Sequence, residues 1–276
     1  MNRGRDDDDS DLFPAPCFEL DHIGRLEMKG RPEPCGSLLP ADAIADSERL
    51  MSASSPPIVV FDLDGTLVDT APDLISALNY VLAREGLRPV PLAAARNMIG
   101  AGARKLLERG LEVEGRAVSV ADLDRLTKDF VDYYAEHIAD GSRPFEGLEA
   151  ALDTLAARGH RFAVCTNKLE WLSKLLLDRL DLTPRFAAIC GADTFGVAKP
   201  DPAFLRETAV RAGGRLPGVI MVGDAGTDVG VARRAQVPVI GVDFGYTDVP
   251  MAELKPDRLI SHMRDLPDAV ASLASA

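Results

Sequence analysis

Short apolar segments alternate with longer amphipathic segments along most of the chain. Residues 58–63 form an apolar run rich in β-branched side chains, which is typical of a buried parallel strand. After residue 146, helical spacing at 147–158, 169–180, 202–213 and 227–235 alternates with strand-like runs at 161–166, 186–190, 218–222 and 237–242. A last strand and helix are predicted within 257–275. This alternation predicts an α/β fold, with a parallel sheet and helices on both of its faces.

The helical pattern continues without a strand signal between the first predicted strand and the second. Helices are predicted at 73–86, 91–99, 103–111 and 121–137. This tract is too long for a simple crossover between neighbouring strands, so it predicts an inserted helical domain. We therefore expect a Rossmann-like α/β core built from residues 56–72 and 146–276, interrupted after its first strand by a helical domain at 73–145.

The first 55 residues lack a sustained hydrophobic period. They contain an aspartate run at 6–9 and scattered Pro and Gly, which indicates a disordered N-terminal extension over residues 1–55. The functional domain is expected to begin near Met51. Because the N-terminus lacks the apolar segment of a signal peptide and the chain has no apolar run long enough to span a bilayer, we expect a cytoplasmic protein.

The charge balance limits the expected partners. The chain carries 31 basic and 43 acidic residues, for a formal net charge of -12. An acidic surface repels nucleic acids and anionic lipids, so we expect neither a nucleic acid nor a membrane as a partner. If the ligand carries phosphate, local positive charge must come from a metal ion or from a well-placed Lys or Arg.

Candidate chemical groups follow the predicted strands. The carboxyl ends of parallel strands meet at one edge of a sheet, where ligands bind. The residues that fall there are Asp62, Asp64, Thr66, Thr166, Asn167, Lys199, Asp224 and Asp228. Carboxylates, hydroxyls, an amide and an ammonium at strand ends, beside apolar strand bodies, predict an active site on a rigid scaffold.

The segments that hold these residues resemble a known family. FDLDGTLVDT, VCTNK, KPDP and GDAGTD occur in the order and approximate spacing of the haloacid dehalogenase-like phosphatase superfamily, and the resemblance extends from about residue 57 to the C-terminus. It implies that the helical insert is a cap domain that closes over the core and selects the leaving group. Longer stretches, such as MIGAGARKLLERGL and GVDFGYTDVPMAELKPDRLI, are similar to bacterial phosphoglycolate phosphatases. That similarity implies Mg²⁺-dependent hydrolysis of a small phosphorylated metabolite, 2-phosphoglycolate, to glycolate and phosphate.

The resemblance also implies roles for the two aspartates of the first motif. Asp62 matches the nucleophile, which forms an aspartyl-phosphate intermediate and so divides one difficult displacement into two easier ones. With an ordinary pKa of about 4, Asp62 is expected to be ionised at neutral pH without an activating base. Asp64 matches the general acid and base, which protonates the leaving alkoxide and later deprotonates the attacking water. Thr66 is expected to fasten the turn that contains them.

The remaining motif residues are expected to supply positive charge and hydrogen bonds. Lys199 would neutralise the phosphoryl oxygens and restrain Asp62, while Thr166 and Asn167 would bind the phosphate. Asp62, the backbone carbonyl of Asp64, and Asp224 match the family's Mg²⁺ site. Asp228 lies one helical turn after Asp224. It would either bind the metal through a water molecule or hold the metal ligands in place by hydrogen bonds. The alternative is an ordinary exposed helix carboxylate.

Two arginines of the predicted cap are candidate substrate contacts, and several other activities remain open. We hypothesise that Arg104 or Arg109 contacts the glycolate carboxylate. The alternative is that both residues lie on a solvated helix face. A phosphosugar mutase would use the same pair of aspartates, and other small phosphate esters or pyrophosphate remain alternative substrates. A dehalogenase is disfavoured because that branch of the superfamily lacks the second aspartate of the first motif, which is present here as Asp64. A binding module without activity is disfavoured because Asp62, Asp64, Lys199 and Asp224 are all present. A monomer or a homodimer is compatible with the sequence.

Overall fold

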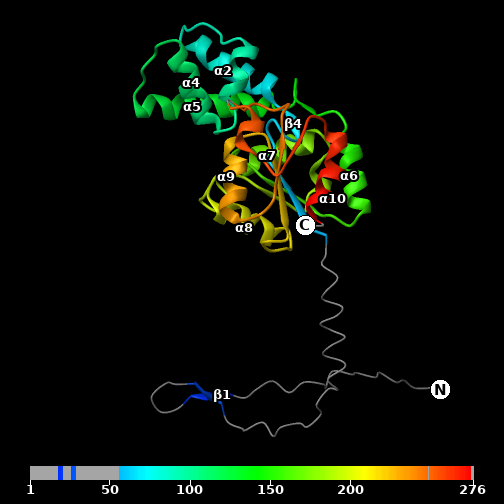
Figure 1. Ribbon diagram of the computed structural model, residues 1–276. Coiled ribbons are helices and arrows are strands. Elements are labelled where there is room, and N and C mark those ends of the chain that lie inside the picture. Colours follow the sequence, from blue (N-terminus) through cyan, green and yellow to red (C-terminus); the bar gives the residue numbers. More distant parts are fainter. Residues whose placement is uncertain (1–17, 21–25, 29–55, 248, 275–276) are drawn as a thin grey trace, which may run out of the picture. The chain divides into compact units, whose positions relative to one another are not determined.

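The computed structural model describes residues 18–20, 26–28, 56–247 and 249–274 (Figure 1). The chain divides into two compact units, Met1–Ser54 and Ser55–Ala276. In the first unit, β1 (Phe18–Leu20) pairs antiparallel with β2 (Leu26–Met28). The rest of the predicted extension, including a domain start near Met51, lies outside the described residues. All further elements belong to the second unit.

A six-stranded parallel sheet forms the centre of the second unit. Its order is β10-β9-β8-β3-β6-β7, and every neighbouring pair is parallel. The strands are β3 (Ile58–Phe61), β6 (Phe162–Cys165), β7 (Ala188–Cys190), β8 (Val219–Gly223), β9 (Val239–Val242) and β10 (Arg258–Ile260). Because β3 lies inside the sheet with both faces covered, all four of its residues are apolar and buried.

Helices cover both faces of this sheet, which confirms the predicted α/β core. Val59 and Phe61 of β3 belong to one apolar cluster, which they share with α6 (Leu148–Ala157), α7 (Glu170–Arg179) and α10 (Leu266–Ala274). Ile58 and Val60 point the opposite way and pack with α8 (Pro202–Arg211) and α9 (Gly226–Ala235). Figure 1 shows α8 and α9 on one side of the strands and α6 and α10 on the other. Short 3₁₀ turns complete the core at Thr183–Arg185, Met251–Leu254 and Met263–Asp265.

The inserted domain consists of helices, as predicted. It contains α2 (Ala71–Arg84), α3 (Leu92–Ala95), α4 (Ala103–Val113) and α5 (Val120–Glu136), with a 3₁₀ turn at Arg96–Met98. Helices α2, α4 and α5 pack against one another through buried side chains such as Leu78, Leu107 and Leu126. In Figure 1 this group lies beyond one end of the sheet. Among the described residues, no helix is long and apolar enough to cross a membrane.

The two chain segments that connect the core and the cap lie side by side. They form a short antiparallel pair, β4 (Val68–Asp69) with β5 (Arg143–Pro144), which the sequence analysis did not predict. The buried carboxylate of Asp73 in α2 ties the second segment to the helix. It accepts hydrogen bonds from the Ser142 backbone N–H at 2.8 Å and from the Ser142 hydroxyl at 2.6 Å. The insert is therefore anchored at both of its ends.

Candidate active site

Asp62 stands at the carboxyl end of the central strand β3 and is 4% exposed. Its Oδ1 accepts the backbone N–H of Leu63 at 2.7 Å and lies 2.8 Å from the Lys199 ammonium. Burial raises the pKa of Asp62 to about 6; Lys199 opposes the shift, while Asp228 adds to it. The expectation of an ordinary pKa is therefore corrected, because the sequence does not reveal how deeply the carboxylate is buried. A group with this pKa is still largely ionised at neutral pH.

Two further carboxylates lie beside Asp62. One oxygen from each of Asp62, Asp224 and Asp228 lies within 4.8 Å of the others, and all three side chains are buried. Asp224 accepts a hydrogen bond from the Thr66 hydroxyl at 2.9 Å and another from the Tyr246 backbone N–H at 2.7 Å. Burial raises the pKa of Asp224 to about 8, and the negative charges of Asp62 and Asp228 add to the shift. Thr66, which was expected to fasten the turn of the first motif, thus contacts Asp224, 158 residues later in the sequence.

Lys199 joins two of these carboxylates. Its Nζ lies 2.8 Å from Asp62 Oδ1 and 2.6 Å from Asp228 Oδ1. Burial lowers the pKa of Lys199, but the carboxylates of Asp228 and Asp62 outweigh burial and raise it. Asp228 is completely buried and also accepts the Ala225 backbone N–H at 3.0 Å, so it is not an exposed helix carboxylate.

A divalent cation fits this arrangement. One ammonium does not neutralise three buried carboxylates, and burying excess charge is costly unless it is compensated. The raised pKa values of Asp62 and Asp224 express that excess. Carboxylate oxygens are the ligands that Mg²⁺ prefers. The side chain of Asp64 is not part of this acidic cluster, so only its backbone carbonyl is a candidate ligand there.

Two glycines allow the backbone to approach Asp224 closely. Gly65 has φ +83°, and a Cβ at this position would lie 2.3 Å from Asp224 Oδ2. A Cβ at Gly245 would lie 2.3 Å from the same oxygen. Gly65 lies in the FDLDGTLVDT segment, between Asp64 and Thr66. The second glycine lies between β9 and β10, far from any predicted site residue, and only its place in the fold reveals its role.

Asn167 and Thr166 follow β6. The Asn167 side chain accepts the Lys199 backbone N–H at 2.9 Å and donates to the Lys199 carbonyl at 3.4 Å. It therefore holds the loop that presents the Lys199 ammonium. The Thr166 hydroxyl accepts the Lys168 backbone N–H at 3.2 Å, which leaves the hydroxyl proton for another acceptor.

Asp64 faces away from the acidic cluster. Its Oδ1 accepts the Thr70 hydroxyl at 2.8 Å and forms an ion pair with Lys168 Nζ at 2.7 Å. The Lys168 ammonium also lies 4.5 Å from the centre of the Tyr134 ring, which comes from the cap. Neither Lys168 nor Tyr134 was among the residues predicted for the site. Lys168 belongs to the VCTNK motif, whereas Tyr134 falls within the helix predicted at 121–137, where a tyrosine is ordinarily part of a core.

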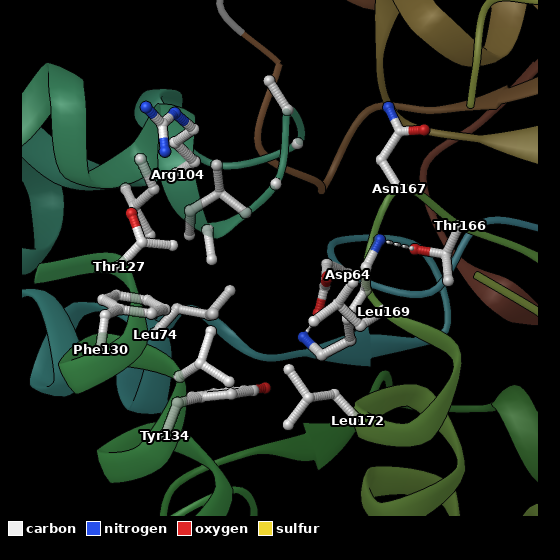
Figure 2. A pocket seen from close by; sticks show the side chains of 18 of the residues that line it. Asp64, Leu74, Arg104, Thr127, Phe130, Tyr134, Thr166, Asn167, Leu169 and Leu172 are labelled. Atoms are coloured by element: carbon white, nitrogen blue, oxygen red, sulfur yellow. Dashed lines mark hydrogen bonds and ion pairs between the residues drawn. The ribbon is translucent and has the colours of Figure 1, made fainter. Parts of the chain in front are cut away.

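A cavity of about 240 Å³ lies between the core and the cap (Figure 2). The core contributes Asp62, Asp64, Thr166, Asn167, Lys168, Leu169 and Leu172 to its wall. The cap contributes a largely apolar wall with Arg104 at its edge: Leu74, Ile99, Gly100, Ala101, Gly102, Ala103, Arg104, Leu106, Thr127, Phe130, Val131 and Tyr134. Arg109 does not belong to this wall, and its guanidinium donates to the Met98 carbonyl at 2.8 Å.

Comparisons with known proteins show the family to which this chain belongs. Residues 59–242 match the model of the haloacid dehalogenase-like hydrolase family. The chain is 47% identical over 208 residues to a phosphoglycolate phosphatase of Mesorhizobium japonicum, a match that covers 75% of this chain and 92% of the relative. It is 45% identical over 214 residues to a phosphoglycolate phosphatase of Agrobacterium fabrum, covering 78% of this chain and 92% of the relative. The crystal structure of a predicted phosphoglycolate phosphatase from Haemophilus somnus superposes with a TM-score of 0.73 at 26% identity, covering 79% of this chain and 99% of that chain.

Proposed function

We propose that this chain, which belongs to the haloacid dehalogenase-like hydrolase family and is a phosphoric monoester hydrolase, acts on 2-phosphoglycolate and uses Mg²⁺. The observation that carries the proposal is the Asp62 carboxylate, which Lys199 fixes at the end of β3 and which lines the cavity between core and cap. The choice of substrate rests on the two relatives called phosphoglycolate phosphatase, which this chain matches over nine-tenths of their length.

Asp62 acts as the nucleophile in this proposal. Its carboxylate oxygen attacks phosphorus, the bond from phosphorus to the ester oxygen breaks, and the phosphoryl group becomes bound to Asp62 as an aspartyl-phosphate. A water molecule then attacks phosphorus, releases inorganic phosphate and restores the carboxylate. The Leu63 N–H and the Lys199 ammonium hold the Asp62 side chain in place throughout.

Asp64 handles the protons of both steps. In its protonated form Asp64 donates a proton to the ester oxygen as glycolate leaves. The carboxylate that results takes a proton from the attacking water in the second step, which restores the acid. Thr70 and Lys168 hold its carboxylate at the cavity wall, on the side from which the leaving group must depart.

The remaining groups balance the charge of the phosphate. Asp62, Asp224 and the Asp64 carbonyl would hold Mg²⁺, supported by Asp228, and the bound ion would offset the repulsion between the Asp62 carboxylate and the phosphate. Lys199 supplies a fixed positive charge beside Asp62. The Thr166 hydroxyl has a proton to donate to a phosphoryl oxygen, and the Asn167 amide lines the same part of the cavity.

A panel of phosphate esters tests the proposal. Phosphate release would be measured with Mg²⁺ for 2-phosphoglycolate, sugar phosphates, nucleotides and pyrophosphate. We expect the kcat/KM for 2-phosphoglycolate to exceed that of each other compound by about 100-fold or more, because binding groups in a small cavity discriminate strongly. Treatment with EDTA should abolish turnover, and added Mg²⁺ should restore it.

The outcomes separate the parts of the proposal. A broad profile with full EDTA sensitivity would contradict the substrate and leave the Asp62 chemistry in place. Turnover that persists in EDTA would contradict the metal requirement. No phosphate release from any ester, together with isomerisation of a sugar phosphate, would favour a mutase instead.

A further inference from the structure

The catalytic steps described above leave one buried cation without a role toward the substrate. Lys168 is 7% exposed and lines the cavity. One of its ammonium hydrogens is directed to Asp64 Oδ1 at 2.7 Å, and an ammonium has three hydrogens to donate. Burying a lysine is costly, and a single carboxylate on one side leaves donors directed elsewhere. Lys168 therefore has hydrogen-bonding capacity beyond its ion pair.

A second polar group in the same region has a proton without an acceptor. Tyr134 of α5 is 1% exposed, and within the described part of the chain its hydroxyl proton has no acceptor. The Lys168 ammonium beside it can only donate to the hydroxyl oxygen. Its ring lies against Lys168, with the ammonium 4.5 Å from the ring centre. Figure 2 shows the hydroxyl of Tyr134 directed from the cap toward the part of the cavity that contains Asp64. An unpaired buried hydroxyl is costly, which indicates that a ligand provides the acceptor.

The position of Lys168 relative to Asp64 indicates which part of a substrate it meets. The ester oxygen must lie against Asp64, because Asp64 protonates it. Lys168 Nζ is hydrogen-bonded to that same carboxylate, so it lies on the leaving-group side rather than the phosphate side. In 2-phosphoglycolate a single methylene separates the ester oxygen from the carboxylate, which brings the carboxylate within reach of this ammonium.

Arg104 is the other cation of the cavity wall, and it is less suited to this task. Its guanidinium is paired with Asp124 and lies 3.7 Å from Glu108, and its side chain is 43% exposed. Figure 2 shows Arg104 across the cavity from Asp64. A charge that is already neutralised and solvated contributes little to binding a distant anion.

We propose that Lys168 and the Tyr134 hydroxyl form the subsite for the carboxylate of the leaving group, and so select phosphate esters with an anionic group one carbon from the ester oxygen. This inference rests on the proposed function and adds the residues that recognise the substrate. Lys168 comes from the core and Tyr134 from the cap, so the subsite is complete only where the two domains meet. Lys168 and Tyr134 would determine specificity only, because neither residue transfers a proton in the reaction or forms a bond to phosphorus.

A comparison of two esters tests this assignment. Ethyl phosphate carries a methyl group where 2-phosphoglycolate carries its carboxylate, and both esters need a protonated leaving group. The test quantity is the ratio of kcat/KM for 2-phosphoglycolate to that for ethyl phosphate. We expect this ratio to fall by about 10- to 100-fold in Lys168→Met, the range for a lost hydrogen bond to a charged group. Most of the change should appear in KM for 2-phosphoglycolate.

Two further variants refine the comparison. Tyr134→Phe keeps the ring against Lys168 and removes only the hydroxyl, so the ratio should fall by a smaller factor, about 3- to 10-fold. Lys168→Arg keeps the charge and should retain more of the ratio than Lys168→Met. Arg104→Met, which removes the other cation of the wall, is the matched control and should leave the ratio unchanged. Thermal unfolding of each variant verifies that it is folded, and Tyr134→Phe carries the same test if Lys168→Met does not fold.

The results distinguish this inference from the proposed function. If the wild-type enzyme hydrolyses ethyl phosphate as efficiently as 2-phosphoglycolate, the proposed substrate is wrong and the subsite with it. If the wild-type enzyme prefers 2-phosphoglycolate but Lys168→Met and Tyr134→Phe slow both esters equally, the substrate stands and the subsite is wrong. In that case Lys168 only positions Asp64.

Discussion

The two walls of the cavity differ in how their polar groups are held. On the core wall, the acidic cluster and Lys199 are fixed by protein partners: Lys199 by two carboxylates, and Asp224 by the Thr66 hydroxyl and the Tyr246 N–H. On the cap wall, most side chains are apolar, and the buried Tyr134 hydroxyl proton has no acceptor among the described residues. The groups that perform chemistry are thus held rigidly before substrate arrives. On the cap wall, the buried Tyr134 hydroxyl is the group that we propose the substrate satisfies.

The largest expected effect comes from the core wall. Asp62→Asn replaces the proposed nucleophile with a nearly isosteric amide that does not attack phosphorus, so turnover should fall by about 10⁴-fold or more. Lys199 keeps its contact with Asp228, so the fold should persist and the melting temperature should change little. Asp132→Asn, at an exposed position of α5, is a matched control that should keep full activity.

Phosphate release and thermal unfolding would be measured on both variants. Activity near the wild-type level in Asp62→Asn would overturn the mechanism. A collapse of the melting temperature would instead show that the charge of Asp62 stabilises the core wall, contrary to the high cost of burying it.

A second prediction compares two glycines that both have a positive φ. Gly65 and Gly86 have φ +83° and +73°, so alanine is strained at both positions by about 1–2 kcal/mol. At Gly86 a new Cβ meets nothing within 4 Å, whereas at Gly65 it meets Asp224 Oδ2 at 2.3 Å. Gly65→Ala should therefore lose a further 1–3 kcal/mol, roughly, in unfolding free energy. It should also lose about 10- to 100-fold in activity, because Asp224 must move.

Urea denaturation and phosphate release measure the two effects. Gly86→Ala should pay only the conformational cost and remain fully active. Equal losses of stability in the two variants, with activity retained in Gly65→Ala, would mean that the core wall adjusts more easily than its close contacts indicate.

The sequence predicted the core wall better than the cap wall, for a physical reason. Asp62, Thr166 and Asp224 each follow a parallel strand, so strand order alone brings them to one edge of the sheet. The sequence left open whether Asp228 is exposed, because an aspartate one turn into a helix is common on surfaces. The partner of its buried carboxylate is Lys199, which lies 29 residues away in the sequence and reaches it only in the assembled fold.

The features that the sequence did not predict depend on contacts between the domains. The β4–β5 pair is two residues long on each side, too short for a recognisable pattern of alternation. Lys168 meets Asp64 across 104 residues of sequence, and Tyr134 meets Lys168 only because α5 closes over the core. A tyrosine at an apolar helical position is ordinarily part of a core. Only the unpaired hydroxyl distinguishes this one.

The smallest expected effects concern the two arginines of the cap. Arg104 is half-exposed and paired with Asp124, so Arg104→Gln should change the KM for 2-phosphoglycolate by less than about twofold, as is usual for exposed ion pairs. Arg109 donates to the Met98 carbonyl, so Arg109→Gln should lower the unfolding free energy by about 0.5–1.5 kcal/mol and leave KM unchanged. Steady-state kinetics and urea denaturation separate the two results. A KM that rises tenfold in Arg104→Gln would place the carboxylate at the cap's edge and not at Lys168. The contrast between the walls would then fail, because the cap would supply the charge that selects the substrate.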